Sequence, residues 1–140
     1  IRRLDKRVRV FSRSCPLFVP LVEQGWMRHD ITRRVAGLYL KPLLKYKVDA
    51  LVLGCTHYPL LKPTLRRVAG KVELIDSAEE TAKAVRSRLE QDGLLLHGRR
   101  RGRVSYFSSD DPEKFARLGA RFMGRVLANV QRIRLDGIDK

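Results

Sequence analysis

The sequence is poor in acidic residues, in cysteines and in long apolar runs. Of its 140 residues, 15 are Asp or Glu, against 30 Lys or Arg, and 2 are Cys. Two cysteines, Cys15 and Cys55, do not make a disulfide framework or a metal site. No apolar run approaches the roughly 20 residues that a membrane-spanning helix needs, and no signal-peptide pattern is present. We therefore expect free thiols in a reducing cytoplasm, no metal and no membrane partner.

Two common signals are also missing. There is no Gly-x-Gly-x-x-Gly nucleotide loop and no internal repeat, and the sequence does not begin with Met. We take the missing Met to indicate a fragment or a processed product. Hydrophobic residues make up 44% and charged residues 32%, as in folded globular proteins, and the length suffices for one domain.

The formal net charge of +15 raises the question of a nucleic-acid partner. The basic residues are spread along the whole sequence, and only His97–Arg103 forms a dense cluster. Scattered Arg side chains on helix faces are mostly solvated surface. We therefore do not expect nucleic acid to be the main partner.

Apolar periodicity and turn residues predict strands that alternate with helices. The predicted strands are Arg7–Ser12, Val48–Leu53, Val72–Asp76, Val104–Ser108 and Val130–Leu135; the predicted helices are Asp30–Leu44, Pro59–Ala69, Ser77–Gln91 and Pro112–Met123. This order favours an α/β fold with a mostly parallel sheet and flanking helices.

Several local details follow from residue type. Cys15–Pro20 is expected to be a loop, because its two prolines cannot donate to a ladder, and Pro42 should break or kink its helix. Asp30 and Ser77 are expected as N-caps, and Gly93 as the residue just after a helix. We expect the strand before Gly54 to be buried on both faces.

The most informative stretch is Leu51-Val-Leu-Gly-Cys-Thr-His-Tyr-Pro59. An apolar run ends at Gly54, three side chains with reactive or polar groups follow consecutively, and a helical pattern then begins. In open α/β sheets, ligands bind beyond the carboxyl ends of the strands. We therefore expect Cys55, Thr56 and His57 to project into a crevice.

A helix N-terminus and a neighbouring imidazole both favour the thiolate form of a cysteine. Cys55 is therefore a candidate nucleophile, or a candidate general base and acid for a carbon-bound proton. Thr56 offers a hydroxyl to a substrate carboxylate. From spacing alone, a buried structural cysteine beside a hydrogen-bonded histidine explains the pattern equally well.

The full string Gly54-Cys-Thr-His-Tyr-Pro59 resembles the C-terminal cysteine motif of glutamate racemase, in the cofactor-independent aspartate/glutamate racemase superfamily. Cys15-Pro-Leu-Phe-Val-Pro-Leu-Val-Glu-Gln-Gly25 and Ile75-Asp-Ser-Ala-Glu-Glu-Thr-Ala82 are similar to flanking segments of that family. Related aspartate racemases usually carry Glu where this sequence has His57, which favours the glutamate branch.

The resemblance implies a two-base mechanism without any cofactor. One cysteine thiolate removes the α-proton of glutamate, and a second cysteine on the opposite face returns a proton to the planar carbanion. Cys55 would serve one face, while Thr56 and His57 would contact substrate and His57 would assist Cys55. Glu23 matches a carboxylate that the family places near this cysteine, although a solvated loop acid is an alternative.

The sequence departs from the family in one respect that matters for activity. The family opens with Asp-Ser-Gly and presents its first catalytic cysteine in Cys-Asn-Thr, and neither motif occurs here. Cys15 is followed by Pro16 and cannot replace the missing thiol. We therefore expect this to be the C-terminal half of a racemase, inactive alone.

The resembled fold has two pseudo-symmetric α/β domains. Residues 1–76 would belong to the second domain, and residues 77–140 would return to the first, absent domain. The implied partners are glutamate and the missing N-terminal half, and a homodimer is left open. The resemblance further implies a bacterial cytoplasm, with D-glutamate supplied for peptidoglycan.

Two other functions fit the sequence. A decayed racemase half could act as a non-catalytic module that binds an anionic metabolite or nucleic acid through its basic surface. Alternatively, Cys55 could serve another amino-acid racemase or a decarboxylase of the same superfamily.

Overall fold

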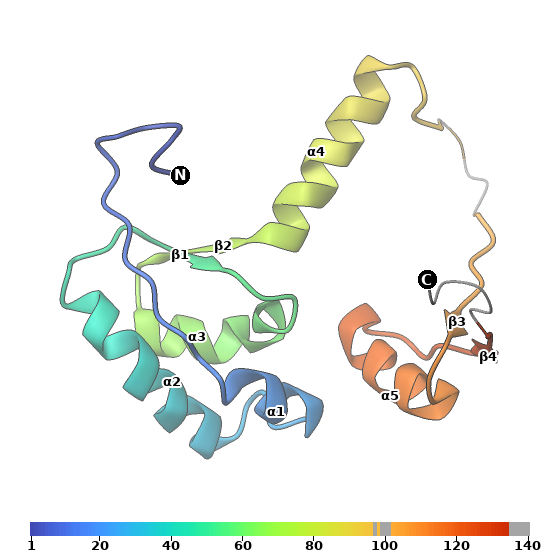
Figure 1. Cartoon of the computed structure of the whole chain (residues 1–140), viewed down its shortest axis with the longest axis horizontal. Helices are drawn as coiled ribbons and strands as arrows, with labels where there is room; N and C mark the ends of the chain where they lie inside the picture. Colours follow the sequence, from blue (N-terminus) through green and yellow to red (C-terminus); the bar gives the residue numbers. More distant parts are fainter. Residues whose placement is uncertain (97, 99–101, 135–140) are drawn as a thin grey trace. The chain divides into compact units, whose positions relative to one another are not determined.

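The computed structural model describes residues 1–96, 98 and 102–134. The chain divides into two compact units, Ile1–Leu95 and Leu96–Lys140. The first unit contains three helices packed on a small sheet, followed by a long fourth helix, and the second contains one helix and two short strands (Figure 1).

The sheet of the first unit consists of two parallel strands, β1 (Ala50–Leu53) and β2 (Glu73–Asp76). Parallel neighbours need a crossover connection, and here a 3-10 turn, η1 (Tyr58–Leu61), and helix α3 (Lys62–Ala69) supply it. The mostly parallel α/β prediction is therefore confirmed.

Helices α1 (Phe18–Glu23), α2 (Asp30–Leu44) and α3 gather on one side of this sheet (Figure 1). Leu53 is buried against them, whereas the side chain of Val52 points the other way and its residue remains 55% exposed. The prediction that this strand is buried on both faces is thus wrong, because helices cover only one face.

The hydrophobic core lies between these helices and the sheet. On α2, Ala36 and Leu40 are one turn apart; from η1 through α3, Leu61, Leu65 and Ala69 repeat every four residues. This spacing places each set on one helix face. Two buried hydroxyls complete the packing without unpaired donors: that of Thr32 donates to Trp26 O at 2.7 Å, and that of Thr64 donates to Met27 O at 2.6 Å.

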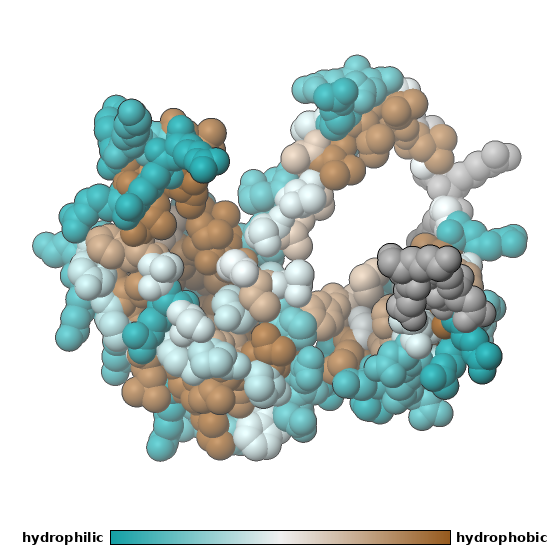
Figure 2. Space-filling view, viewed as in Figure 1, coloured by the Kyte–Doolittle hydropathy of each residue, from teal (hydrophilic) through white to brown (hydrophobic). Residues whose placement is uncertain are grey.

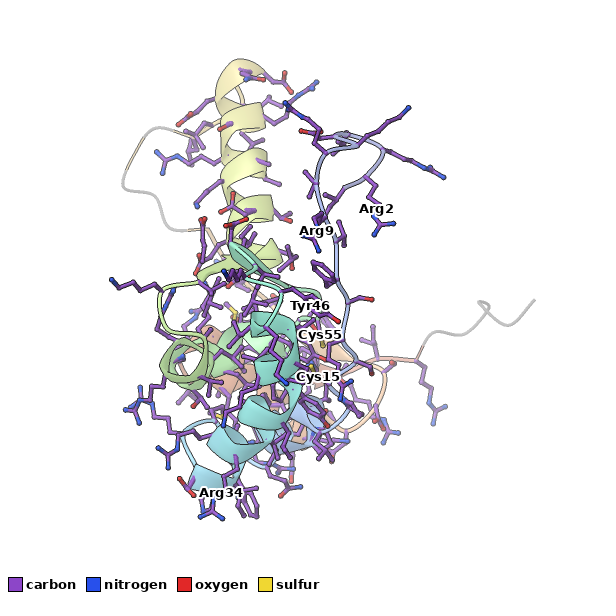
Figure 3. All side chains as sticks on the ribbon, turned by 90° about the vertical axis from the view of Figure 1, so that its left-hand side faces the viewer. Arg2, Arg9, Cys15, Arg34, Tyr46 and Cys55 are labelled. Carbon is purple, nitrogen blue, oxygen red and sulfur yellow. The ribbon has the colours of Figure 1, made fainter. Side chains whose placement is uncertain are left out.

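Two predictions at the start of the chain need correction. The predicted loop Cys15–Pro20 ends at Leu17, and α1 begins at Phe18 although it contains Pro20, because a proline in the first turn removes an N–H that has no intrahelical acceptor. Arg7–Ser12 is not a strand, because none of the described strands pairs with it. Instead, Phe11 stacks on Tyr46 with ring centroids 4.1 Å apart, and the guanidinium of Arg9 lies above Phe11 (Figure 3).

Helices α2 and α4 begin at the predicted residues, but each N-cap lies one residue earlier than predicted. His29, not Asp30, caps α2, since its Nδ1 accepts from Ile31 N. Asp76, not Ser77, caps α4 (Ser77–Gln91), whereas Gly93 follows that helix with a positive φ, as predicted.

Proline explains two further differences. The predicted helix Pro59–Ala69 is divided into η1 and α3, because Pro63 has no N–H to donate to the carbonyl of Pro59. Pro42 lies in the last turn of α2 and the helix ends two residues later, at Leu44.

Helix α4 has no buried residue, and charged side chains hold its N-terminus on the rest of the first unit. Asp76 is buried and accepts from the amides of Ala78 and Glu79, and Lys62 Nζ lies 2.9 Å from Asp76 Oδ2 and also binds Glu79. Val85 on this helix and Leu94 just beyond its end are exposed, and Figure 2 shows apolar surface along this part of the chain.

In the second unit, β3 (Phe107–Ser108) and β4 (Gln131–Arg132) pair in parallel, and α5 (Pro112–Met123) lies between them in sequence. Both strands are shorter than predicted. Leu127 is buried and approaches Gly119 so closely that a Cβ there would lie 2.3 Å from its Cδ1.

Some predictions concern residues outside the described ranges. His97 and residues 99–101 of the basic connector, and Leu135 of the last strand, are among these. Within the described ranges, no helix has the length and apolar character needed to cross a bilayer.

The Asp76–Lys62 contact predicts a pH-dependent loss of stability. Burial raises the pKa of Asp76, but hydrogen bonds from Lys62 and from the amides of Ala78 and Glu79 outweigh burial and hold it below the ordinary value. A lowered folded pKa stabilises the fold above about pH 4, and this stabilisation is lost as pH falls through the folded pKa. We expect Asp76→Asn, which keeps a capping oxygen, to lower the free energy of unfolding at neutral pH by about 1–2 kcal/mol.

Urea unfolding at neutral and at acidic pH measures this effect. The difference between the two proteins should begin to shrink below about pH 4 and should go on shrinking as the pH falls through the lowered pKa of folded Asp76. Asp111→Asn, at the exposed N-cap of α5, is the matched control and should have a smaller effect. A constant difference across this pH range would contradict the assignment.

Candidate functional site

The predicted reactive residues lie at the carboxyl end of β1. The register pairs Leu53 with Asp76, so both strands end at the same edge of the sheet. Gly54 then leads into Cys55, which is half-buried, and Thr56, which is exposed. This is the edge at which ligands bind in open α/β sheets.

His57 is brought to a carboxylate that is distant in the sequence. Its Nε2 lies 3.5 Å from Oε1 of Glu23, the last residue of α1, and its Nδ1 lies 3.4 Å from the hydroxyl of Thr56. The side chains of His57 and Glu23 are 23% and 41% exposed, so solvent reaches the pair. When His57 is protonated, the two side chains form an ion pair.

Tyr58 also belongs to this cluster, although the sequence analysis did not single it out. Its hydroxyl donates to Cys15 O at 3.3 Å, and its ring meets Phe18 edge-on with centroids 5.2 Å apart. Burial raises the pKa of Tyr58, and the nearby groups of Cys15, Cys55 and Tyr39 add to the effect. The hydroxyl therefore stays protonated at neutral pH and can donate. No sequence signal links Tyr58 to a carbonyl 43 positions away.

Cys15 has a different environment from Cys55 (Figure 3). It is 6% exposed in the hydrophobic core, and its thiol lies 3.6 Å from Arg13 O. Burial raises the pKa of the Cys15 thiol, against a smaller opposing effect of Arg13. Cys15 is thus a packed core residue rather than a thiol presented at the sheet edge.

The chemistry available here is proton transfer by a thiol, an imidazole and a carboxylate. Among the described residues, no three His, Cys, Asp or Glu side chains are grouped as metal ligands would be. The sequence places the thiol of Cys55 one residue before a hydroxyl and two residues before an imidazole, groups of the kind that can donate hydrogen bonds to an anion.

The two thiols should differ in reactivity towards iodoacetamide. The thiolate is the reactive form, and burial both shields Cys15 and disfavours its ionisation. In the folded chain near neutral pH, we expect Cys55 to be alkylated at least about 10-fold faster than Cys15. Mass spectrometry of tryptic peptides measures each rate, and in urea the rates should converge. Equal rates in the folded chain would contradict this arrangement.

The chain is similar to curated glutamate racemases, although no model of a protein family matches it. It is 44% identical to glutamate racemase of Neisseria meningitidis serogroup A over 135 residues, which are 96% of this chain and 50% of that protein. Identity is 46% over 136 residues for the Syntrophus aciditrophicus enzyme, covering 96% and 50% of the two chains. The chain spans about half the length of the curated relatives it matches.

Solved structures of glutamate racemases are also similar to this chain. Glutamate racemase from Thermus thermophilus, in complex with β-chloro-D-alanine, matches with a TM-score of 0.78 and 43% identity over 88% of this chain and 47% of that one. The Francisella tularensis enzyme in complex with D-glutamate matches with a TM-score of 0.84 and 30% identity over 96% and 51% of the two chains. By sequence and by fold, this chain is a homologue of the glutamate racemases along about half of their length.

Proposed function

We propose that this chain is the C-terminal half of a glutamate racemase and contributes one of the two thiols that interconvert L- and D-glutamate. The contact that carries this proposal is the 3.5 Å approach of His57, two residues after Cys55 in the sequence, to Glu23. It joins the two segments whose motifs resemble the family, in a chain 44% identical to a curated glutamate racemase.

Cys55 acts on one face of the substrate. As a thiolate it accepts the α-proton of glutamate, and the electron pair of the broken C–H bond remains on the planar carbanion. A second thiol, from the other half of the enzyme, gives its proton to the opposite face. The two thiols exchange protonation states, so no cofactor or redox partner is required.

The neighbouring side chains bind and assist. The hydroxyl of Thr56 and the imidazole of His57 contact the substrate, and His57 also stabilises the thiolate of Cys55. Glu23 keeps the imidazole oriented, as a carboxylate commonly does for a catalytic histidine. Because one thiol cannot serve both faces of a carbanion, the isolated chain is inactive.

The biological setting follows from the same assignment. D-glutamate produced in a bacterial cytoplasm would supply peptidoglycan and hence the cell wall. The partners are glutamate and the N-terminal half, onto which residues 77–140 would pack. A homodimer of the complete enzyme is compatible with this assignment.

The decisive experiment is to read the DNA upstream of the codon for Ile1 and express the complete reading frame. We expect an upstream Asp-Ser-Gly and Cys-Asn-Thr, racemisation of glutamate by the complete product, and none by the isolated chain. Cys55→Ser should lower the rate by about 10²- to 10⁴-fold, the usual effect of losing an acid–base group. Cys15→Ala retains the main-chain carbonyl and should lower it by less than about 10-fold.

Other outcomes would support the other two functions. Turnover of a different amino acid, with glutamate inert, would indicate another thiol enzyme of the superfamily. An upstream stop codon, no turnover, and affinity for oligonucleotides that falls steeply with salt would indicate a binding module.

A further inference from the structure

We propose that Tyr58 is a positioning residue, which holds helix α1 so that Glu23 stands opposite His57. The inference deepens the proposed function and rests on it for the role of Cys55. The ring and the hydroxyl of Tyr58 contact the start of α1, and Glu23 is the last residue of that helix.

One carbonyl at the start of α1 accepts two hydrogen bonds. Cys15 O accepts the amide of Phe18 at 3.1 Å and the hydroxyl of Tyr58 at 3.3 Å. Phe18 is 1% exposed and lies edge-on to both Tyr58 and Tyr39, with centroid distances of 5.2 and 5.3 Å. Edge-to-face aromatic pairs have a preferred geometry, so these contacts fix both the position and the direction of α1.

Because α1 is short, its start determines where its end lies. Six residues span about 9 Å at 1.5 Å per residue. Two adjacent residues therefore contact α1 at its two ends. Tyr58, the first residue of η1, contacts Phe18, and His57, the last residue of the reactive loop (residues 54–57), contacts Glu23. A tilt of α1 at Phe18 would move the carboxylate away from the imidazole.

Tyr58 is also tied to the loop that carries the thiol. Its amide donates to Cys55 O at 3.1 Å and closes the turn that presents Thr56 and His57. The same residue thus joins the loop to α1 through its side chain and shapes the loop through its main chain. Loss of the Tyr58 hydroxyl should therefore change the reactivity of Cys55 through the Glu23–His57 pair.

Tyr39 provides a matched control. It packs against the other side of the same Phe18 ring, and its hydroxyl accepts from Leu17 N at 3.4 Å. Tyr39→Phe removes a hydroxyl that binds the N-cap amide of α1, but Tyr39 lies on α2, so the link between α1 and the segment of Cys55 is left intact. A general loosening of the core should affect both tyrosine variants alike, whereas positioning should affect only Tyr58→Phe.

The test measures alkylation of Cys55 by iodoacetamide across pH, followed on its own tryptic peptide, in the full chain. The variants are Tyr58→Phe, Glu23→Gln, their combination, and Tyr39→Phe, each checked for folding by thermal melting. We expect Tyr58→Phe and Glu23→Gln each to slow alkylation near neutral pH by about 3- to 10-fold, the range for one lost hydrogen bond. The combined variant should be no slower than the slower single variant, which shows that both act through one contact. Tyr39→Phe should stay within about twofold.

Several results would overturn the inference. One is an alkylation rate of Cys55 in Tyr58→Phe or in Glu23→Gln that equals the rate in the unmodified chain. Another is a combined variant whose loss of rate is the product of the two single losses. A third is an equal loss of rate in Tyr58→Phe and Tyr39→Phe. None of these readouts requires turnover. Failure of the complete gene product to racemise glutamate would instead reject the proposed function and leave the alkylation result standing.

Discussion

The parallel pairing of β1 with β2 is the constraint on which the first unit depends. Parallel strands cannot be joined by a tight hairpin, so the chain must cross back through η1 and α3. That crossover forms much of the core, and it begins at the loop of Cys55. The same register places Asp76 beside Leu53, so the anchored start of α4 and the reactive loop share one edge of the sheet.

The site itself is assembled by a second, side-chain constraint. Helix α1 makes no strand pairing and is only six residues long, yet it supplies both the aromatic anchor and the carboxylate of the cluster. Its placement depends on Phe18, which is enclosed between two tyrosines from different elements. Packing and acid–base geometry are therefore linked here, since the residue that carries the imidazole is next to one that packs the core.

Solvent-exposed apolar side chains are the other consistent feature of the chain. Val52 on the open face of the sheet, Val85 on α4, and Phe115 and Phe122 on α5 are all exposed. In the function proposed above, the N-terminal half would cover part of this surface. That residues 77–140 pack on that half remains a prediction.

Much of this protein was determined by the sequence alone. Glycines, prolines and apolar periods located the strands before Gly54 and Ser77 and the helices ending near Leu44, Gln91 and Met123, because these signals act within a few residues. Local sequence gave wrong predictions where a neighbouring segment decides the outcome. Arg7–Ser12 alternates as a strand does but pairs with none of the described strands. Asp76, not Ser77, caps α4, because the end of β2 turns its carboxylate towards the helix. The resemblance implied that Glu23 lies near Cys55, but only the tertiary structure gave its contact with His57 and that of Tyr58 with Cys15, since contacts between distant segments depend on how whole elements pack.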